Sequence, residues 1–325
     1  MNDVFDRIRS AAARVAERSR HVRIEEAGLR ALCRRLAEEP EPQSAGDPVQ
    51  RPFAEPAHTL AFVVTLDAIN FGSGWFPHLR KPGGRSGYFT IASALRARFE
   101  AEGPWSSAAL RELTPEECAR VFGQGAPRSG GEPRPVDELM GLYARALEDL
   151  GRYLDTRFDG RFEGLVDAAA GRASALVLLL AEMPFYRDVS RYAGFDVPLF
   201  KRAQITVSDL ANAFGGEGPG RFEDRAGLTM FADNLVPHVL RLEGALACRE
   251  ELVQRIESEQ EIPAGSEEEV ELRACGLHAV ELCVAELRRL GVEASAERLD
   301  HRLWFRGQRP EFKARPRHRT RSVFY

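Results

Sequence analysis

The sequence predicts a predominantly α-helical fold, built as a single domain with a few short strands. Apolar residues recur at helical spacing over most of the chain, and glycine- and proline-rich stretches separate these segments. No internal repeat and no long biased linker divides the chain. With 325 residues, of which 44% are apolar and 29% charged, there is ample material for a sizeable core.

Two helices are predicted within residues 1–40. Over 4–20, apolar residues recur at helical spacing with arginines between them, and a similar pattern predicts a second helix over 26–39. The polar stretch 39–58 contains five prolines and predicts a loop over 41–58, which leaves 59–325 as the main body of the domain.

The main body is expected to be mostly helical. The apolar segment that begins at Leu60 is compatible with either a short strand or a buried helix. Thr114, Pro115 and Glu117 have the spacing of a helix N-cap, a proline at the first helical position and a capping box. Further helices are predicted over 90–101, 136–152, 164–181, 203–214, 234–247, 267–290 and 296–305.

Composition argues against several classes of protein. The net charge of −4 disfavours a protein that grips extended DNA or RNA, because such proteins need a basic surplus for the phosphates. The five cysteines form no CxxC pair and no metal-ligand spacing is present, so neither a metal nor another cofactor is expected. The longest apolar stretch, 175–181, is far short of the ~20 residues of a membrane span. A soluble cytoplasmic protein without a secretory signal is expected.

Asp233 is the strongest candidate for a catalytic residue. It precedes a predicted helix at the N-cap position, with Pro237 in the first turn. Backbone N–H groups and the helix dipole favour a carboxylate there, and hydrolysis of an N-glycosidic bond needs negative charge beside the oxocarbenium-like sugar. Most aspartates at this position only cap their helix, so the segment alone leaves both interpretations open.

Other segments offer groups for binding a base, a sugar and a phosphate. The stretch from 198 to 233 has the outline of a helix, a glycine-rich turn and a second helix, and Lys201 adds a cation there. Asp300 lies four residues before Trp304, on the same face of a predicted helix. Polar and aromatic residues also alternate at a loop that follows the apolar segment, which suits a stacking pocket: Asn70, Phe71 and Trp75. Surface or core roles remain the commoner explanation for each of these residues.

Five blocks of the sequence, in this order, resemble the queuosine salvage family of queuosine 5′-phosphate N-glycosidases. They are AERSRHVRIEEAGL, LDAINF with Trp75, FYRDV followed by FKRAQITVSDL, LTMFADNLVPHVL, and LDHRLWF with RHRTRSVFY. Family members often read LDYYLWD at the last motif. Here His301 and Arg302 replace the two tyrosines, and Phe305 replaces the final acid.

The resemblance implies a scaffold similar to the helix-hairpin-helix DNA glycosylases and release of queuine from queuosine 5′-phosphate without a metal. It implies that Asp233 is the nucleophile or the stabiliser of the oxocarbenium ion. Phe231 would form a wall of the base pocket, Asp300 would bind the deazaguanine edge, and Lys201 would contact the phosphate or ribose. His301 and Phe305 are expected to line the same site, and the protein to act as a monomer.

Two alternatives remain at this point. One is a nucleic-acid glycosylase on the same scaffold, which the acidic net charge disfavours. The other is a non-catalytic protein that binds queuine.

Overall fold

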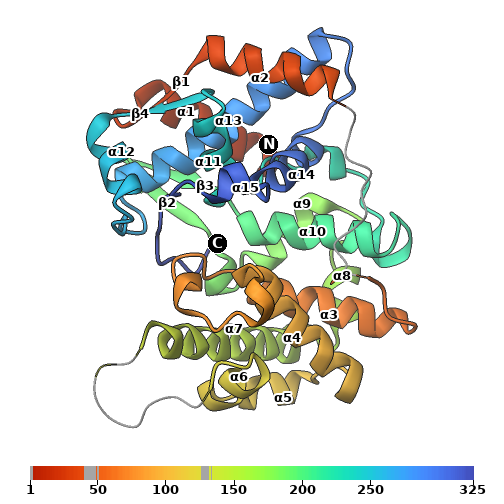
Figure 1. Cartoon of the computed structure of the whole chain (residues 1–325). Coiled ribbons are helices and arrows are strands. Elements are labelled where there is room, and N and C mark those ends of the chain that lie inside the picture. Colours follow the sequence, from red (N-terminus) through yellow and green to blue (C-terminus); the bar gives the residue numbers. More distant parts are fainter. Residues whose placement is uncertain (1–2, 40–48, 50, 126–131, 133) are drawn as a thin grey trace.

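The computed structural model describes residues 3–39, 49, 51–125, 132 and 134–325. It confirms the predicted class, because helices dominate and the strands are short (Figure 1). The α-helices are α1 (Val4–Arg18), α2 (Glu26–Glu38), α3 (Pro56–Ala68), α4 (Gly87–Glu102), α5 (Ser107–Glu112), α6 (Pro115–Val121), α7 (Pro135–Phe158), α8 (Phe162–Asp167), α9 (Ala173–Leu180), α10 (Lys201–Ala213), α11 (Leu235–Leu242), α12 (Glu250–Glu257), α13 (Glu267–Arg289), α14 (Ala296–Gly307) and α15 (Pro310–Lys313).

The strands form two antiparallel pairs, and short 3-10 helices lie in the connections. Strand β1 (Val22–Ile24) pairs with β4 (Leu246–Cys248), and β2 (Val189–Tyr192) pairs with β3 (Phe195–Pro198). The 3-10 helices are η2 (Phe76–His78), η3 (Pro82–Gly84), η4 (Pro184–Tyr186), η5 (Gly218–Gly220) and η6 (Arg225–Gly227).

The N-terminal helices are held by α13, against which α1 and α2 both pack. Glu271 of α13 fixes the segment between them, because its carboxylate accepts hydrogen bonds from the backbone N–H groups of Arg20, His21 and Val22 at 2.9, 2.6 and 2.9 Å. Tyr192 of the β2–β3 hairpin donates its hydroxyl proton to the same carboxylate at 2.8 Å. One buried side chain thus joins the N-terminal segment, the hairpin and α13.

Helices α3 to α7 gather in the lower half of Figure 1. The apolar segment that begins at Leu60, for which either a strand or a helix was expected, lies in helix α3. Helices α4, α7, α8 and α10 all pack around it. Its residues from Thr59 to Ala68 are buried on every side, which explains why the segment shows no helical periodicity. Helix α7 is the centre of this half, with α5 and α6 packed along it.

The chain returns to the middle of the molecule at its C-terminus (Figure 1). There the backbone N–H of Gly72 donates to the carbonyl of Tyr325 at 3.0 Å, and that of Ile262 donates to Arg319 at 2.8 Å. Helix α14 packs on α11 and α13 in the other half of the molecule. The C-terminal segment therefore contacts both the α3–α7 half and the half that contains α11.

The hydrogen bonds that cap a helix were predicted more accurately than the residues at which helices end. The capping box is confirmed: the Thr114 hydroxyl accepts from the Glu117 N–H at 3.2 Å and Glu117 accepts from the Thr114 N–H at 2.9 Å. The single helix predicted over 164–181 is wrong, because Ala170 and Gly171 adopt left-handed φ angles of 50° and 70° that separate α8 from α9. The helix predicted over 234–247 ends at Leu242, before the chain turns into β4.

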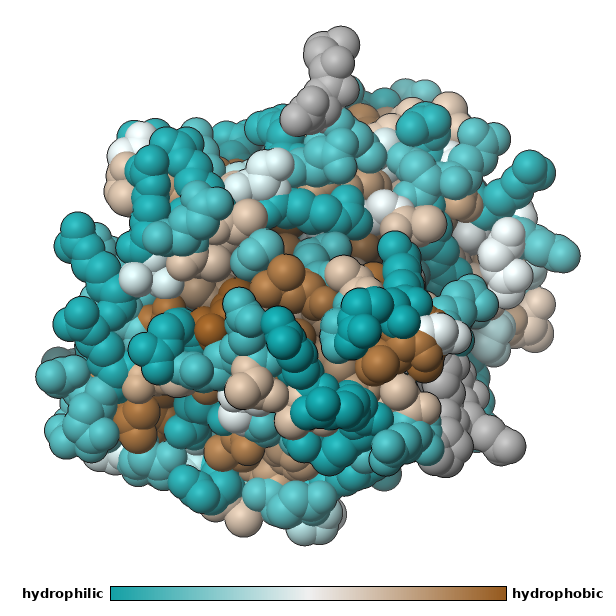
Figure 2. Space-filling model, turned by 90° about the horizontal axis from the view of Figure 1, so that it is seen from above, coloured by the Kyte–Doolittle hydropathy of each residue, from teal (hydrophilic) through white to brown (hydrophobic). Residues whose placement is uncertain are grey.

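Figure 2 shows one face of the molecule, on which hydrophilic side chains predominate and hydrophobic ones appear mainly in a recessed central area. In the part of the chain that the structure describes, no helix has the length and apolar character needed to cross a membrane. Residues 41–48 and 50 of the predicted loop over 41–58 lie outside the described residues, and α3 begins within its last three positions.

Candidate active site

Asp233 lies half-buried just before α11, with its carboxylate turned onto the start of that helix. Its Oδ1 accepts hydrogen bonds from the backbone N–H groups of Leu235 at 2.7 Å and Val236 at 3.2 Å. The helix begins at Leu235 with Asn234 at the N-cap position, so Asp233 caps from one residue further out than predicted. These two bonds fix one carboxylate oxygen, and no hydrogen bond from a described residue occupies Oδ2.

The extended segment before Asp233 is held by three side chains from three different helices. Gln204 of α10 accepts from the backbone N–H of Thr229 at 2.9 Å, and Asp300 of α14 accepts from that of Phe231 at 2.9 Å. Arg273 of α13 donates its Nε–H to the carbonyl of Ala232 at 2.8 Å. Because these residues form no regular structure of their own, such side-chain bonds determine where Asp233 stands.

Asp300 is buried on α14, and its carboxyl group faces Asp233. Burial raises its pKa well above the ordinary value, and the nearby Asp233 carboxylate raises it further. The Phe231 N–H and the Lys201 ammonium oppose the rise in pKa. The site therefore contains two aspartates in different surroundings, and the protonated form of Asp300 is favoured.

Lys201 is the first residue of α10 and is buried beside these two acids. Its ammonium donates to the carbonyl of Asn70 at 3.2 Å. Burial lowers the pKa of Lys201, while the carboxyl groups of Asp233, Asp67 and Asp300 favour its charged form. The structure thus brings Lys201, Asp233 and Asp300 together, as the sequence predicted.

Asn70 reaches this cluster mainly through its backbone. Its carbonyl accepts from Lys201, whereas its side-chain amide donates to Oδ1 of Asp67 at 3.2 Å. Asp67 is fully buried at the end of α3, and burial raises its pKa to about 7, against the opposing effects of the Asn70 hydrogen bond and the Lys201 charge. Asp67 belongs to the LDAINF block but was not among the predicted site residues, and the structure brings its carboxyl group close enough to Lys201 for the two charges to interact.

Phe71 and Trp75 make core contacts. The Phe71 ring packs edge-on against Tyr143, with the ring centroids 5.1 Å apart, and the Arg202 guanidinium lies 4.9 Å from it. Trp75 is 2% exposed and donates its indole N–H to Glu138 at 2.8 Å. Both residues support the loop behind Asn70, and their described contacts do not include Asp233 or Asp300.

The aromatic residues of α14 contact Phe231 and two rings of α4. The Phe231 and His301 rings lie 5.7 Å apart, beside Asp300. Trp304 contacts Tyr88, Phe89 and Phe305. Phe305 is 43% exposed. Burial lowers the pKa of His301 and so favours the neutral ring, which is suited to stacking.

The sequence model of the queuosine salvage protein family matches residues 50–325 of this chain. The chain belongs to this family. A protein of Sphaerobacter thermophilus named queuosine 5′-phosphate N-glycosylase/hydrolase is 39% identical over 269 residues, which cover 81% of this chain and 80% of the relative. Proteins with the same name in Mus musculus and Dictyostelium discoideum are 31% and 32% identical, over 98% and 82% of this chain and 98% and 78% of theirs.

Three of the sequence blocks that resemble the family meet at Asp233. FKRAQ supplies Lys201 and Gln204, TMFAD supplies Phe231 and Asp233, and LDHRLW supplies Asp300. These three blocks therefore form one spatial cluster, assembled from segments spread over residues 201–300.

The queuosine salvage motif FYRDV contains a residue whose role the sequence did not reveal. Asp188 forms a buried two-point ion pair with Arg273, with N–O distances of 3.0 and 2.6 Å. Its Oδ2 also accepts from the backbone N–H of Lys201 at 3.1 Å. Because Arg273 holds the Ala232 carbonyl, this pair positions both Lys201 and Asp233.

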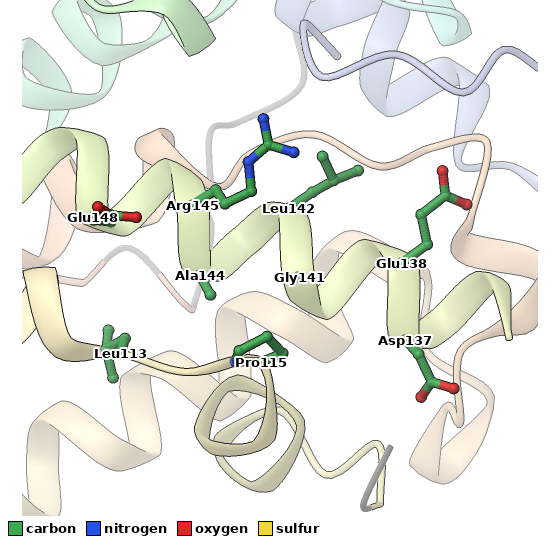
Figure 3. Close-up of a pocket in the computed structure, with 9 residues that line it drawn as sticks. All are labelled: Leu113, Pro115, Asp137, Glu138, Gly141, Leu142, Ala144, Arg145 and Glu148. Carbon is green, nitrogen blue, oxygen red and sulfur yellow. The ribbon is translucent and has the colours of Figure 1, made fainter. Parts of the chain in front are cut away.

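A hollow of about 470 Å³ lies elsewhere, along α7, and contains none of the predicted site residues of this family member (Figure 3). Leu142 and Arg145 project from one side of the helix there, and Glu138 is already bonded to Trp75 and Arg321. A cluster of His21, Glu267 and Glu271 has metal-ligand spacing, but the Glu271 carboxylate is occupied by backbone N–H groups. Neither feature competes with the Asp233 cluster.

Proposed function

We propose that this protein hydrolyses the N-glycosidic bond of queuosine 5′-phosphate and releases queuine for salvage. The observation that carries the proposal is the cluster of Asp233, Asp300 and Lys201, which the family's own sequence blocks build. Relatives that cover most of the chain have names describing this reaction. The reaction itself needs water as its only co-reactant.

Asp233 acts at the sugar. As the bond between C1′ and the base nitrogen breaks, the ribose acquires oxocarbenium character and positive charge at C1′. Oδ1 is fixed by two backbone N–H groups, which leaves Oδ2 to face C1′ as a nucleophile or as a stabilising charge. Water supplies the hydroxyl group that ends on C1′ and the proton that balances the departing base.

Asp300 and the neighbouring rings bind the base. A deazaguanine presents adjacent N–H donors on its edge, and a carboxylate is their natural acceptor. Asp300 already bonds the Phe231 N–H through Oδ1, so Oδ2 is the oxygen that serves the base. Phe231 and His301 provide flat surfaces beside it, and the exposed Phe305 lies further along α14. The backbone carbonyl of Asn70 accepts a hydrogen bond from Lys201 and so helps to place its ammonium. Phe71 and Trp75 support the loop that carries Asn70.

The remaining expectations belong to the same proposal. We expect a single domain over 1–325 that is related to the helix-hairpin-helix glycosylases and acts as a cytoplasmic monomer. The acidic net charge of −4 agrees with action on a free nucleotide rather than on a nucleic acid. The nucleic-acid glycosylase alternative requires salt-sensitive binding to oligonucleotides. The binding-protein alternative requires tight queuine binding without release of base.

The test is to incubate the purified protein with queuosine 5′-phosphate and to follow free queuine by liquid chromatography and mass spectrometry. We expect release by the wild type and by Asp196→Asn, a matched change in the exposed β2–β3 hairpin. Asp233→Asn should abolish release and retain queuine binding. Failure of the folded wild type to release queuine would refute the proposed function.

A further inference from the structure

Arg202 is buried at the start of α10, directly after Lys201, and is 1% exposed. Its guanidinium has an unusual set of partners for a buried charge. Within the described part of the chain, its hydrogen bonds all go to backbone carbonyl oxygens and none goes to a carboxylate. Burying a cation without an acid to pair it is costly, which indicates that this arginine has a specific task.

The guanidinium joins four segments of the chain, its own helix included. Its Nη1 group donates to the carbonyls of Asp67 at 3.2 Å and Ala68 at 2.6 Å, the last two residues of α3. Its Nη2 group donates to the carbonyl of Phe185 in η4 and to that of Val323 in the C-terminal segment at 2.8 Å. The last carbonyls of a helix have no partner within it, so Arg202 supplies donors that the end of α3 lacks.

Two aromatic rings lie against the guanidinium. Its carbon is 4.6 Å from the centre of the Tyr186 ring and 4.9 Å from that of Phe71. Burial lowers the pKa of Arg202, whereas Tyr186, Asp188 and Asp67 favour its charged form. A flat group with donors in a fixed fork suits this place, and a lysine ammonium, which is a compact point charge, reaches fewer of the carbonyls.

The same turn of the chain also holds Lys201. Its ammonium donates to the carbonyl of Asn70 at 3.2 Å, two residues after the Ala68 carbonyl that Arg202 binds. Two adjacent side chains of α10 therefore hold residues 67–70 together. If that turn moves, the acceptor that places the Lys201 ammonium moves with it.

The backbone is strained where α10 begins. Phe200 has left-handed φ and ψ angles of 46° and 42°, which are unfavourable for an aromatic residue. The Asp188 carbonyl accepts from the N–H groups of Leu199 at 2.9 Å and Phe200 at 3.3 Å, and its carboxylate accepts from that of Lys201 at 3.1 Å. Such a conformation persists only while surrounding contacts maintain it, and the side chain of Arg202 supplies further contacts of this kind.

We propose that Arg202 is a positioning residue for the glycosidase reaction, which holds the Lys201 ammonium beside Asp233 and Asp300 through the turn at 67–70. The inference rests on the proposed function. Arg202 acts through Lys201 and does not itself touch substrate. The Lys201 charge interacts with both aspartates, so a shift of the ammonium changes the electrostatics at the bond that breaks. A purely structural arginine would affect folding and leave the kinetics of the folded molecules unchanged.

The experiment is a double-mutant cycle between Arg202 and Lys201, read out as kcat/KM for queuosine 5′-phosphate. It compares the wild type, Arg202→Met, Lys201→Met and the double variant, each below its unfolding transition and under single-turnover conditions with excess enzyme. Arg202→Met should lower kcat/KM about 10- to 100-fold in the wild-type background. In the Lys201→Met background the same change should cost less than about threefold, because the ammonium that Arg202 positions is absent.

Two further variants sharpen the cycle. Arg202→Lys retains the charge but cannot bind all four carbonyls, so it should restore only part of the lost activity. Arg191→Met removes an exposed arginine that pairs with Asp196 in the β2–β3 hairpin, and it should leave kcat/KM unchanged in both backgrounds.

Equal fold losses from Arg202→Met in the two backgrounds would overturn the inference, as would wild-type kinetics in the folded variant. If circular dichroism shows that Arg202→Met does not fold, Arg202→Lys replaces it in the cycle, and the same two outcomes decide. Queuine release by the wild type is measured in the same assay. Its absence would refute the proposed function, whereas release with equal losses in both backgrounds would refute only the role of Arg202.

Discussion

Asp233 and Asp300 are two aspartates of one site, but the chain supports them in opposite ways. Asp233 stands at the start of a helix, where unpaired backbone N–H groups meet its carboxylate at 2.7 and 3.2 Å. Asp300 lies in the middle of α14, where the backbone donors are used by the helix, and its described hydrogen bond comes from Phe231 in another segment. Burial and Asp233 therefore raise the pKa of Asp300.

The difference suits the two aspartates to the two tasks proposed for them. Backbone N–H groups at a helix start stabilise a carboxylate, whereas burial of a carboxyl group in mid-helix favours its neutral form. Changes at each aspartate and at the residues that position them separate these tasks. They are ordered here by their expected effect on turnover.

Asp233→Asn should have the largest effect. Asparagine caps a helix about as well as aspartate, so thermal stability should change by less than about 1 kcal/mol, while loss of the charge beside C1′ should lower kcat by roughly 10³-fold or more. Single-turnover release of queuine and a thermal melt measure the two quantities. Loss of stability together with activity would mean that Asp233 acts mainly as a cap.

Asp188→Asn should have the next largest effect, although Asp188 need not touch substrate. The change leaves the buried Arg273 without its charge partner and should cost about 3–5 kcal/mol in the free energy of unfolding. Displacement of Lys201 and Ala232 should lower kcat by about 10²-fold in the protein that remains folded. Urea unfolding and assays below the transition measure both effects. Equal stability to Asp196→Asn would contradict the positioning role.

Asp300→Asn should weaken base binding more than the chemical step. We expect a roughly 10- to 100-fold loss of queuine affinity, because an amide offers one acceptor in place of a charged pair. The raised pKa of Asp300 gives a second readout. Since the N–H donors of the base favour the carboxylate, queuine binding should release a proton and tighten as pH rises. Calorimetry in buffers of different ionisation enthalpy detects that proton, which should be absent in Asp300→Asn.

Asp67→Asn should affect turnover least and the pH dependence of stability most. In the folded protein the pKa of Asp67 is raised from 3.8 to about 7, so between these values the native state holds a proton that the unfolded chain has released. Stability therefore falls as pH rises from about 4 to about 7. Asparagine should flatten this part of the profile. An unchanged profile, measured by urea unfolding across the same pH range, would show that Asp67 does not titrate there.

Features determined by neighbouring residues were predictable from the sequence. The capping box at Thr114 depends on residues three apart, and α1 and α7 each show an apolar face with the correct period. Helix α3 was ambiguous because it is buried on all sides. The break between α8 and α9 depends on the left-handed backbone at Ala170, for which the residue type gives no warning.

The site was predictable only where a family motif marks it. Asp233, Asp300 and Lys201 lie in the sequence blocks that resemble the family. The Asp188–Arg273 pair joins positions 85 apart, and no pattern in the sequence indicates that they meet. Arg317 is one of several arginines in a basic segment. Its charge interaction with Asp233 follows from the fold and not from any spacing in the sequence.

Helix α13 connects the N-terminal segment to this chemistry. Glu271 and Arg273 stand two residues apart on it; one binds the N–H groups of Arg20, His21 and Val22, and the other binds the carbonyl before Asp233. Those three amide protons are therefore protected from exchange with deuterated solvent only while this part of α13 stays folded. Their exchange rates report how often the helix that supports Ala232 opens.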